Sequence, residues 1–150
     1  MSTPTLDRVP ANTAPAINDE IARDTIDRVA RCAPSNRAIE ARLRRLRREW
    51  DVERALEAGA ASLVVTGMAL AAVHDRRWRW LPVVVGSFLL QHAVQGWCPP
   101  LPVFRRLGFR TADEIARERY ALKATRGDFA GLGLDRGPGS ALRAFRAARP

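Results

Sequence analysis

Residues 58–73, AGAASLVVTGMALAAV, and residues 80–104, WLPVVVGSFLLQHAVQGWCPPLPVF, decide the fold of this chain. Neither stretch contains Asp, Glu, Lys or Arg, and the basic loop HDRRWR at positions 74–79 separates them. The four tryptophans stand at the ends of the two stretches, at Trp50, Trp78, Trp80 and Trp97. Apolar spans with interfacial aromatic residues and cationic flanks are what a two-helix membrane hairpin requires. The sequence therefore predicts an all-α protein with a transmembrane hairpin over residues 51–110.

The two spans differ in length and in apolar content. At about 1.5 Å rise per residue, residues 58–73 cover about 24 Å of a roughly 30 Å hydrocarbon core. The second span is richer in Val, Leu and Phe, and Pro82 falls in its first turn, where a missing N–H is tolerated. We expect the spans to insert as a pair, with the second helix ending near Trp97. The alternative is a soluble helical bundle, but few other apolar segments are present to cover both spans.

Positive charge dominates the rest of the chain. There are 25 Lys and Arg residues against 16 Asp and Glu residues, which gives a formal net charge of +9 at pH 7. Such a chain attracts polyanions, whether anionic lipid headgroups, nucleic acid or an acidic partner. The arginines outside the hairpin outnumber the three in the loop, so both termini are expected to be cytoplasmic. No signal peptide is readable in residues 1–10, and insertion is expected to use the internal spans themselves.

The segment before the hairpin divides into two parts. Residues 1–16 contain three prolines among small polar residues, which predicts a flexible arm. Residues 17–50 predict a basic helical region, in which Asn18 caps a first helix and Ser35 or Asn36 caps a second. In the second helix, apolar residues recur at helical spacing and form one stripe, which consists of Ile39, Leu43, Leu46 and Trp50.

Arginines surround this apolar stripe, at positions Arg42, Arg44, Arg45, Arg47 and Arg48. In the favoured interpretation the helix lies on an anionic membrane surface and these arginines contact lipid headgroups. Two alternatives remain open: the helix pairs with the preceding helix, or it binds nucleic acid. The membrane interpretation is favoured because the helix runs directly into the first apolar span.

After the hairpin, Thr111 and Glu114 form a capping box. It predicts a capped helix over residues 111–127, which Gly127 ends. Residues 128–150 are rich in Gly, Pro, Ala and Arg and predict a disordered tail, since they cannot bury a core.

Small polar residues follow helical spacing inside both spans. Ser87, Gln91 and Gln95 share one face of the second span, and Ser62 and Thr66 share one face of the first. Polar side chains in lipid normally face another helix, so these five are predicted to make helix–helix contacts. A solute path is the alternative. Because two helices cannot enclose a pore, it would require a homo-oligomer formed through the hairpin.

Few residues are candidates for metal binding or catalysis. His92 and Cys98 could contribute to a metal or haem site, but zinc needs about four ligands and the only other histidine, His74, lies at the opposite end of the hairpin. No phosphate-binding loop, nucleophile–base arrangement or pair of catalytic carboxylates can be assembled. We therefore expect no metal, no cofactor and no catalytic residues, and hence a protein that is not an enzyme.

The stretch Gly96-Trp97-Cys98-Pro99, followed by Leu107-Gly108, resembles the end of the second helix in the YgaP-like inner-membrane domain family. The resemblance covers about residues 50–110 and marks Gly96, Cys98, Pro99 and Gly108 as family positions. It implies a two-helix hairpin in the bacterial inner membrane. Some members carry a rhodanese sulfurtransferase domain before the hairpin. The first 50 residues of this chain are too short for that domain, so its activity is not carried over.

Three functional hypotheses follow. The first is a non-enzymatic membrane protein that binds lipids, preferably anionic ones, and acts as an anchor, adaptor or membrane-organising subunit. The second, which rests on the family resemblance, is a thiol- or sulfur-handling membrane protein that uses Cys98 and has a sulfur-metabolism protein as partner. The third, the least favoured, is nucleic-acid binding by the arginine-rich helix; its test is salt-dependent binding.

Overall fold

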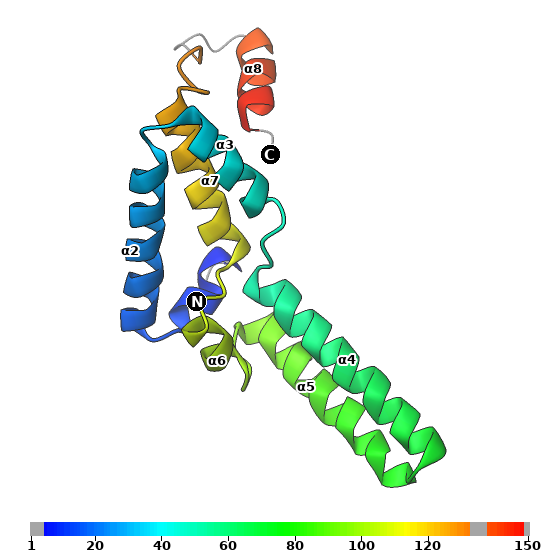
Figure 1. Ribbon diagram of the computed structural model, residues 1–150. Coiled ribbons are helices and arrows are strands. Elements are labelled where there is room, and N and C mark those ends of the chain that lie inside the picture. Colours follow the sequence, from blue (N-terminus) through cyan, green and yellow to red (C-terminus); the bar gives the residue numbers. More distant parts are fainter. Residues whose placement is uncertain (1–4, 133–137, 149–150) are drawn as a thin grey trace. The chain divides into compact units, whose positions relative to one another are not determined.

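The computed structural model describes residues 5–132 and 138–148 (Figure 1). Within these ranges the chain forms helices joined by short connections, and no strand occurs in them. The predicted all-α class is thus confirmed. The elements are η1 (Thr5–Asp7), α1 (Arg8–Ala11), α2 (Pro15–Cys32), α3 (Asn36–Leu46), α4 (Val52–Val73), η2 (Arg76–Arg79), α5 (Trp80–Gln95), α6 (Leu101–Arg106), α7 (Ala112–Arg126) and α8 (Pro138–Ala148).

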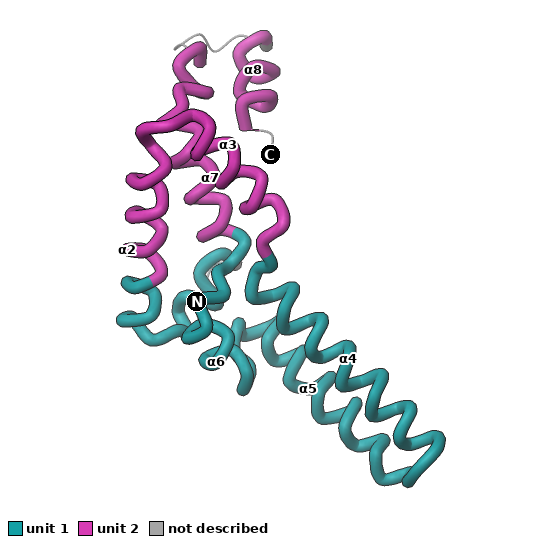
Figure 2. The backbone as a smooth tube through the Cα atoms, in the orientation of Figure 1, with its two compact units in different colours: residues 1–20, 50–112 teal, residues 21–49, 113–150 magenta. Residues whose placement is uncertain are grey.

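The chain divides into two compact units (Figure 2). The first, called the hairpin unit below, comprises residues 1–20 and 50–112. The second, called the basic helical unit, comprises residues 21–49 and 113–150. The hairpin unit therefore contains both apolar segments, and the basic helical unit contains α3 and its arginines.

In the hairpin unit, α4 and α5 lie side by side and η2 joins them (Figure 1). The two helices approach closely at Gly67, where a Cβ atom would lie 2.7 Å from Pro82 Cδ and 3.2 Å from Leu81 Cβ. Helix α4 begins at Val52 because the Asp51 carboxylate caps it, accepting a hydrogen bond from Arg54 N at 2.7 Å. Small residues at a helix contact allow this close packing.

A small apolar core closes the base of the hairpin. It consists of Val9, Val52, Leu56, Cys98 and Leu101, with Trp97, Phe104 and Phe109 packed against it. Val9 belongs to α1, so residues 5–16 differ from the flexible arm that the sequence predicts; residues 1–4 lie outside the described ranges. The physical reason is long-range: Val9 is buried in this core, and Asn12 Nδ2 donates to Gln95 O at 3.0 Å.

Two expected helix boundaries are corrected. Helix α2 begins at Pro15, not near Asn18, and proline suits a first helical position because it lacks the N–H that would have no partner there. The Asn18 side chain donates to Pro10 O at 2.9 Å and is not the predicted N-cap. Helix α3 ends at Leu46, so Trp50 is not part of its apolar stripe. Trp50 lies in the hairpin unit, where the Arg54 guanidinium sits 4.5 Å from its ring centroid.

The basic helical unit has its own core. Of the two predicted caps, Ser35 is the one that caps α3, since its Oγ accepts a hydrogen bond from Ala38 N at 3.3 Å. The stripe of α3 packs against α7, and the buried residues are Ile39, Leu43, Leu46, Ile115 and Leu122, with Val29 and Cys32 beside them. The apolar face of the basic helix is therefore covered by protein.

The C-terminal part agrees with the sequence in α7 and differs after it. Helix α7 ends at Arg126, and Gly127 follows with a φ of 87°, as a C-terminal glycine predicts. Residues 138–148 form α8, although the sequence predicts a disordered tail over residues 128–150. Pro138 suits a first helical position, and the Ala, Leu and Arg residues after it favour helix. Residues 133–137 and 149–150 lie outside the described ranges.

Candidate functional site

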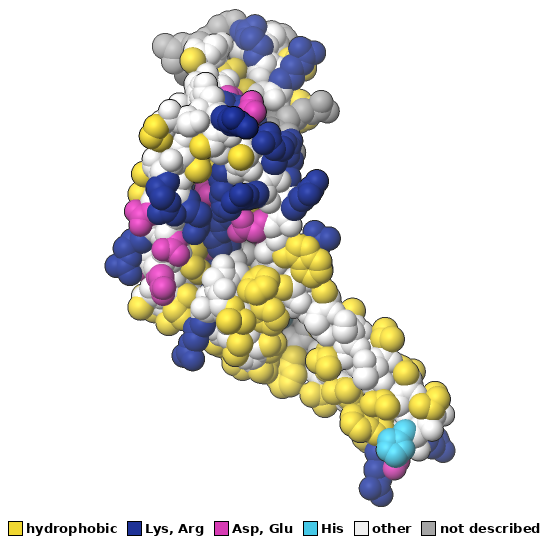
Figure 3. Space-filling view, in the orientation of Figure 1, with side chains coloured by type: hydrophobic (Ala, Val, Ile, Leu, Met, Phe, Trp, Pro, Cys, Tyr) yellow, Lys and Arg dark blue, Asp and Glu magenta, His cyan; other side chains and the backbone are white. Residues whose placement is uncertain are grey.

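The most prominent surface of the hairpin unit is apolar. Helix α4 is the one helix in the described part of the chain that is long and apolar enough to cross a membrane; α5 has sixteen residues. Figure 3 shows hydrophobic side chains along this segment, with charged residues and His74 at its tip. The exposed large apolar residues of the two helices are Leu63, Val65, Met68, Val73, Trp80, Val83, Val84, Phe88, Leu89, Leu90 and Val94.

The predicted polar contacts between the helices differ in the structure. Ser62, Thr66 and Ser87 each donate from the hydroxyl to the carbonyl four residues earlier in their own helix, at 2.8 Å. Gln91 Nε2 donates to Gln95 Oε1 within α5 at 3.5 Å. Hydroxyl groups of Ser and Thr often make such local bonds in helices. The close contact between α4 and α5 is instead made by Gly67, Leu81 and Pro82. The prediction that these five residues join the two helices is corrected accordingly.

Of the positions that the family resemblance marks, Gly96, Cys98 and Pro99 lie at or just after the end of α5, and Gly108 lies just after α6. Gly96 ends α5 with a φ of 75°, and a Cβ there would lie 2.8 Å from both the carbonyl carbon and the oxygen of Arg8. Gly108 has a φ of 86° with open space around it, and Pro99 lies in the exposed turn before α6. Two of the four positions are thus left-handed glycines, which L side chains rarely replace without strain.

Cys98 is buried in the core at the hairpin base, with 4% of its surface exposed. Burial raises the pKa of the Cys98 thiol, although a hydrogen bond from the Leu101 backbone lowers it in part. Reactive cysteines are instead partly exposed and have a lowered pKa, because the thiolate is the nucleophile. These surroundings favour a structural role for Cys98, as a small residue of the core, over a role in thiol handling.

His92 lies in the last turn of α5 and lines a cavity of about 300 Å³. Arg8, Glu53 and Glu57 line the same cavity. The His92 Nδ1 atom is buried and has no hydrogen-bond partner among the described residues. Within that part of the chain no group of three or more His, Cys, Asp or Glu side chains could hold a metal ion. Glu53 and Glu57 stand at i, i+4 spacing near the start of α4, which places them on one face of the helix and is the signal in the sequence that could have found them.

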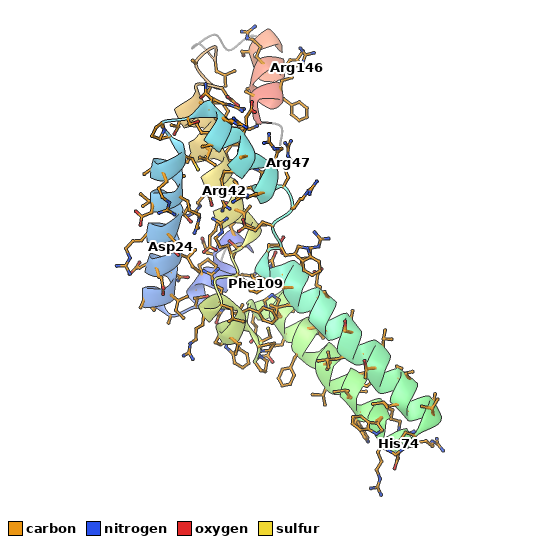
Figure 4. All side chains as sticks on the ribbon, viewed as in Figure 1. Asp24, Arg42, Arg47, His74, Phe109 and Arg146 are labelled. Atoms are coloured by element: carbon orange, nitrogen blue, oxygen red, sulfur yellow. The ribbon has the colours of Figure 1, made fainter. Side chains whose placement is uncertain are left out.

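The five arginines predicted to contact headgroups do not behave alike. Arg42 points into the basic helical unit, and its Nε donates to Glu118 Oε1 at 2.6 Å while its Nη2 donates to Oε2 at 3.0 Å (Figure 4). This hydrogen bond with Glu118 is the largest cause of the raised pKa of Arg42. The prediction for Arg42 is corrected, because its guanidinium is occupied by the protein itself. The other four are exposed: Arg44, Arg45, Arg47 and Arg48.

Glu118 is the centre of a buried ionic cluster that the sequence analysis missed. Its side chain is fully buried on α7 and also accepts from Arg28 Nε of α2 at 3.4 Å. One carboxylate thus joins three helices of the basic helical unit. In the sequence, Glu118 falls on the same helix face as the apolar residues Ile115 and Leu122, which indicates a buried carboxylate. Its partners cannot be found in this way, because they are 76 and 90 residues away.

Comparison with known families gives a match over the hairpin. Residues 51–114 match the family model described as inner membrane protein YgaP-like, transmembrane domain. The resemblance to this family is thus confirmed over residues 51–114. No curated protein and no solved structure matches the chain. The family match and the apolar helix α4 together indicate an inner-membrane protein.

Proposed function

We propose that this chain, whose residues 51–114 match the model of the YgaP-like transmembrane domain, is a non-enzymatic membrane anchor or adaptor. Its hairpin, α4 and α5, crosses the membrane and holds the basic helical unit on the cytoplasmic side. The observation that carries the proposal is the exposed apolar surface of α4 and α5. Such a large apolar patch is unfavourable in water and favourable in hydrocarbon.

Charge supports the cytoplasmic placement of the basic helical unit. Arginine-rich segments near membrane spans stay on the cytoplasmic side. Four exposed arginines, Arg44, Arg45, Arg47 and Arg48, lie at the end of α3 and directly after it. They stand three to seven positions before Asp51, which caps α4, so the positive charge is close to the span along the chain. The loop of the hairpin, with Arg76, Arg77 and Arg79, is then on the outer side.

Two matched substitutions test the membrane crossing. Leu90 in α5 and Leu107 after α6 are about equally exposed, at 67% and 70%. Leu90→Arg places a charge in the hydrocarbon, which is unfavourable by about 2.5–3.5 kcal/mol near the bilayer centre. Leu107→Arg leaves the span unchanged. We expect the L90R chain to be reduced in alkaline-washed membranes and the L107R chain to remain there. Equal retention of both variants would contradict the proposal, because a water-exposed hairpin tolerates either arginine.

A further inference from the structure

A groove in the basic helical unit is lined mainly by cationic side chains. It has a volume of about 770 Å³, within the range of small-molecule sites, and lies between α3, α7 and α8. The cations that line it are Arg44, Arg47, Arg119, Lys123, Arg126 and Arg146. Two carboxylates, Glu40 and Asp128, also line it. The groove therefore carries an excess of four positive charges.

The two carboxylates are already engaged by part of this set. Asp128 forms a two-point ion pair with Arg126, with distances of 2.7 and 2.6 Å, and this hydrogen bond is the main cause of the lowered pKa of Asp128. Glu40 lies 3.7 Å from Arg44 and 4.0 Å from Arg126. In the described part of the chain, Arg47, Arg119 and Arg146 have no carboxylate partner. These three arginines carry three of the four excess positive charges, and Lys123 carries the fourth.

Two buried groups in the groove also point to an anionic ligand. The Arg119 Nε atom is buried and has no hydrogen-bond acceptor among the described residues. Lys123, the only lysine of the chain, is buried and donates to Ala147 O of α8 at 3.0 Å. Burial is the largest cause of the lowered pKa of Lys123, and nearby arginines lower it further although Asp128 raises it. A negatively charged acceptor in the groove would accept a hydrogen bond from Arg119 Nε and would stabilise the charged form of Lys123.

We propose that this groove binds the phosphate group of an anionic ligand, which Arg47 and Arg119 hold by charge-assisted hydrogen bonds. Guanidinium groups suit phosphate oxygens because their planar donors can bond two of them at once. The phosphate has two potential sources. One is the headgroup of an anionic phospholipid, since Arg47 precedes the first residue of α4 by five positions. The other is a soluble phosphate compound. This site goes beyond the proposed anchoring and does not depend on it.

Titration of the full chain in neutral detergent, at fixed physiological salt, tests the site. The probes are short-chain phosphatidylglycerol for the lipid source and inorganic phosphate for the soluble one. We expect saturable binding of at least one probe. The double variant Arg47→Gln/Arg119→Gln should weaken it by about tenfold or more, since each lost bond involves charged groups. Binding of the lipid alone identifies a headgroup site, and binding of inorganic phosphate with the same sensitivity identifies a soluble ligand.

The matched control is Arg31→Gln/Arg37→Gln, which removes the same charge from exposed positions of the same unit outside the groove. It should change the affinity by less than about twofold. Arg146→Gln, at an exposed position of α8, should weaken binding without disturbing the α3–α7 core, and circular dichroism checks that each variant stays folded. Equal losses in the two double variants, or no saturable binding of either probe to the wild-type chain, would overturn the proposal.

Discussion

Replacing Glu118 by leucine is expected to destabilise the basic helical unit by about 3–5 kcal/mol, because it leaves two guanidinium groups without their buried partner. The carboxylate is fully buried and binds Arg42 at 2.6 Å and Arg28 at 3.4 Å. These arginines are themselves mostly buried, with 19% and 26% of their side chains exposed. Arg42 keeps its pair with Glu49 at 3.4 Å and Arg28 its pair with Asp24 at 3.9 Å, but the inner side of each guanidinium loses the fully buried carboxylate that it faces.

Two further variants distinguish the ionic effect from a general effect of the substitution. Glu40→Leu changes an exposed glutamate on α3 whose ion pairs are 3.7 Å and longer, and should cost about 1 kcal/mol or less. Adding Arg42→Met to Glu118→Leu should recover part of the lost stability, because an apolar pair can replace a buried ion pair. Hydrogen exchange of the α3 and α7 amides in the full chain measures the change locally. Similar losses for the Glu40 and Glu118 variants would contradict the assignment.

The second large effect is expected for Gly96→Ala, at the end of α5. Alanine at a φ of 75° costs about 1–2 kcal/mol in conformational energy. Its Cβ would also lie 2.5 Å from Arg8 Cβ and 2.8 Å from Arg8 backbone atoms, which cannot rotate away. Overpacking of this kind adds about 1–3 kcal/mol. We therefore expect the hairpin base to lose about 2–5 kcal/mol and α1 to be displaced.

Gly108→Ala is the matched control for this prediction. Gly108 has a similar φ of 86°, but nothing lies within 4 Å of a Cβ placed there. Its substitution should therefore cost only the conformational part, about 1–2 kcal/mol. Hydrogen exchange in α1 and at the end of α5 reports the difference. If both variants lost equal stability, the close approach of Arg8 to Gly96 would not support the hairpin base.

Local signals in the sequence predicted much of the fold. Ser35 caps α3, Pro82 lies in the first turn of α5, and Gly127 follows α7, because caps and left-handed glycines depend on neighbouring residues alone. Gly96 and Gly108, which the family resemblance marks, both have a positive φ, and only the backbone geometry shows this.

The missed features depend on residues that are far apart in the sequence. Val9 lies in a proline-rich segment, and its core partners Val52, Leu56, Cys98 and Leu101 are far away in the sequence, so no local pattern predicts its burial. Glu118 and Arg42 are 76 positions apart, so no local pattern pairs them. The apolar stripe of α3 was correctly identified up to Leu46, but its periodicity is the same whether lipid or another helix covers it.

If α4 and α5 cross the membrane, the hairpin loop and the basic helical unit lie on opposite sides of it. Labelling of single cysteines from one side of the membrane measures this in the full chain, in a Cys32→Ser background that keeps the buried Cys98. We expect His74→Cys, in the exposed hairpin loop, to react with an impermeant maleimide on intact spheroplasts. We expect Asn36→Cys, at the exposed start of α3, to react only after permeabilisation. Labelling of both cysteines from the same side would show that the hairpin does not cross the membrane in this way.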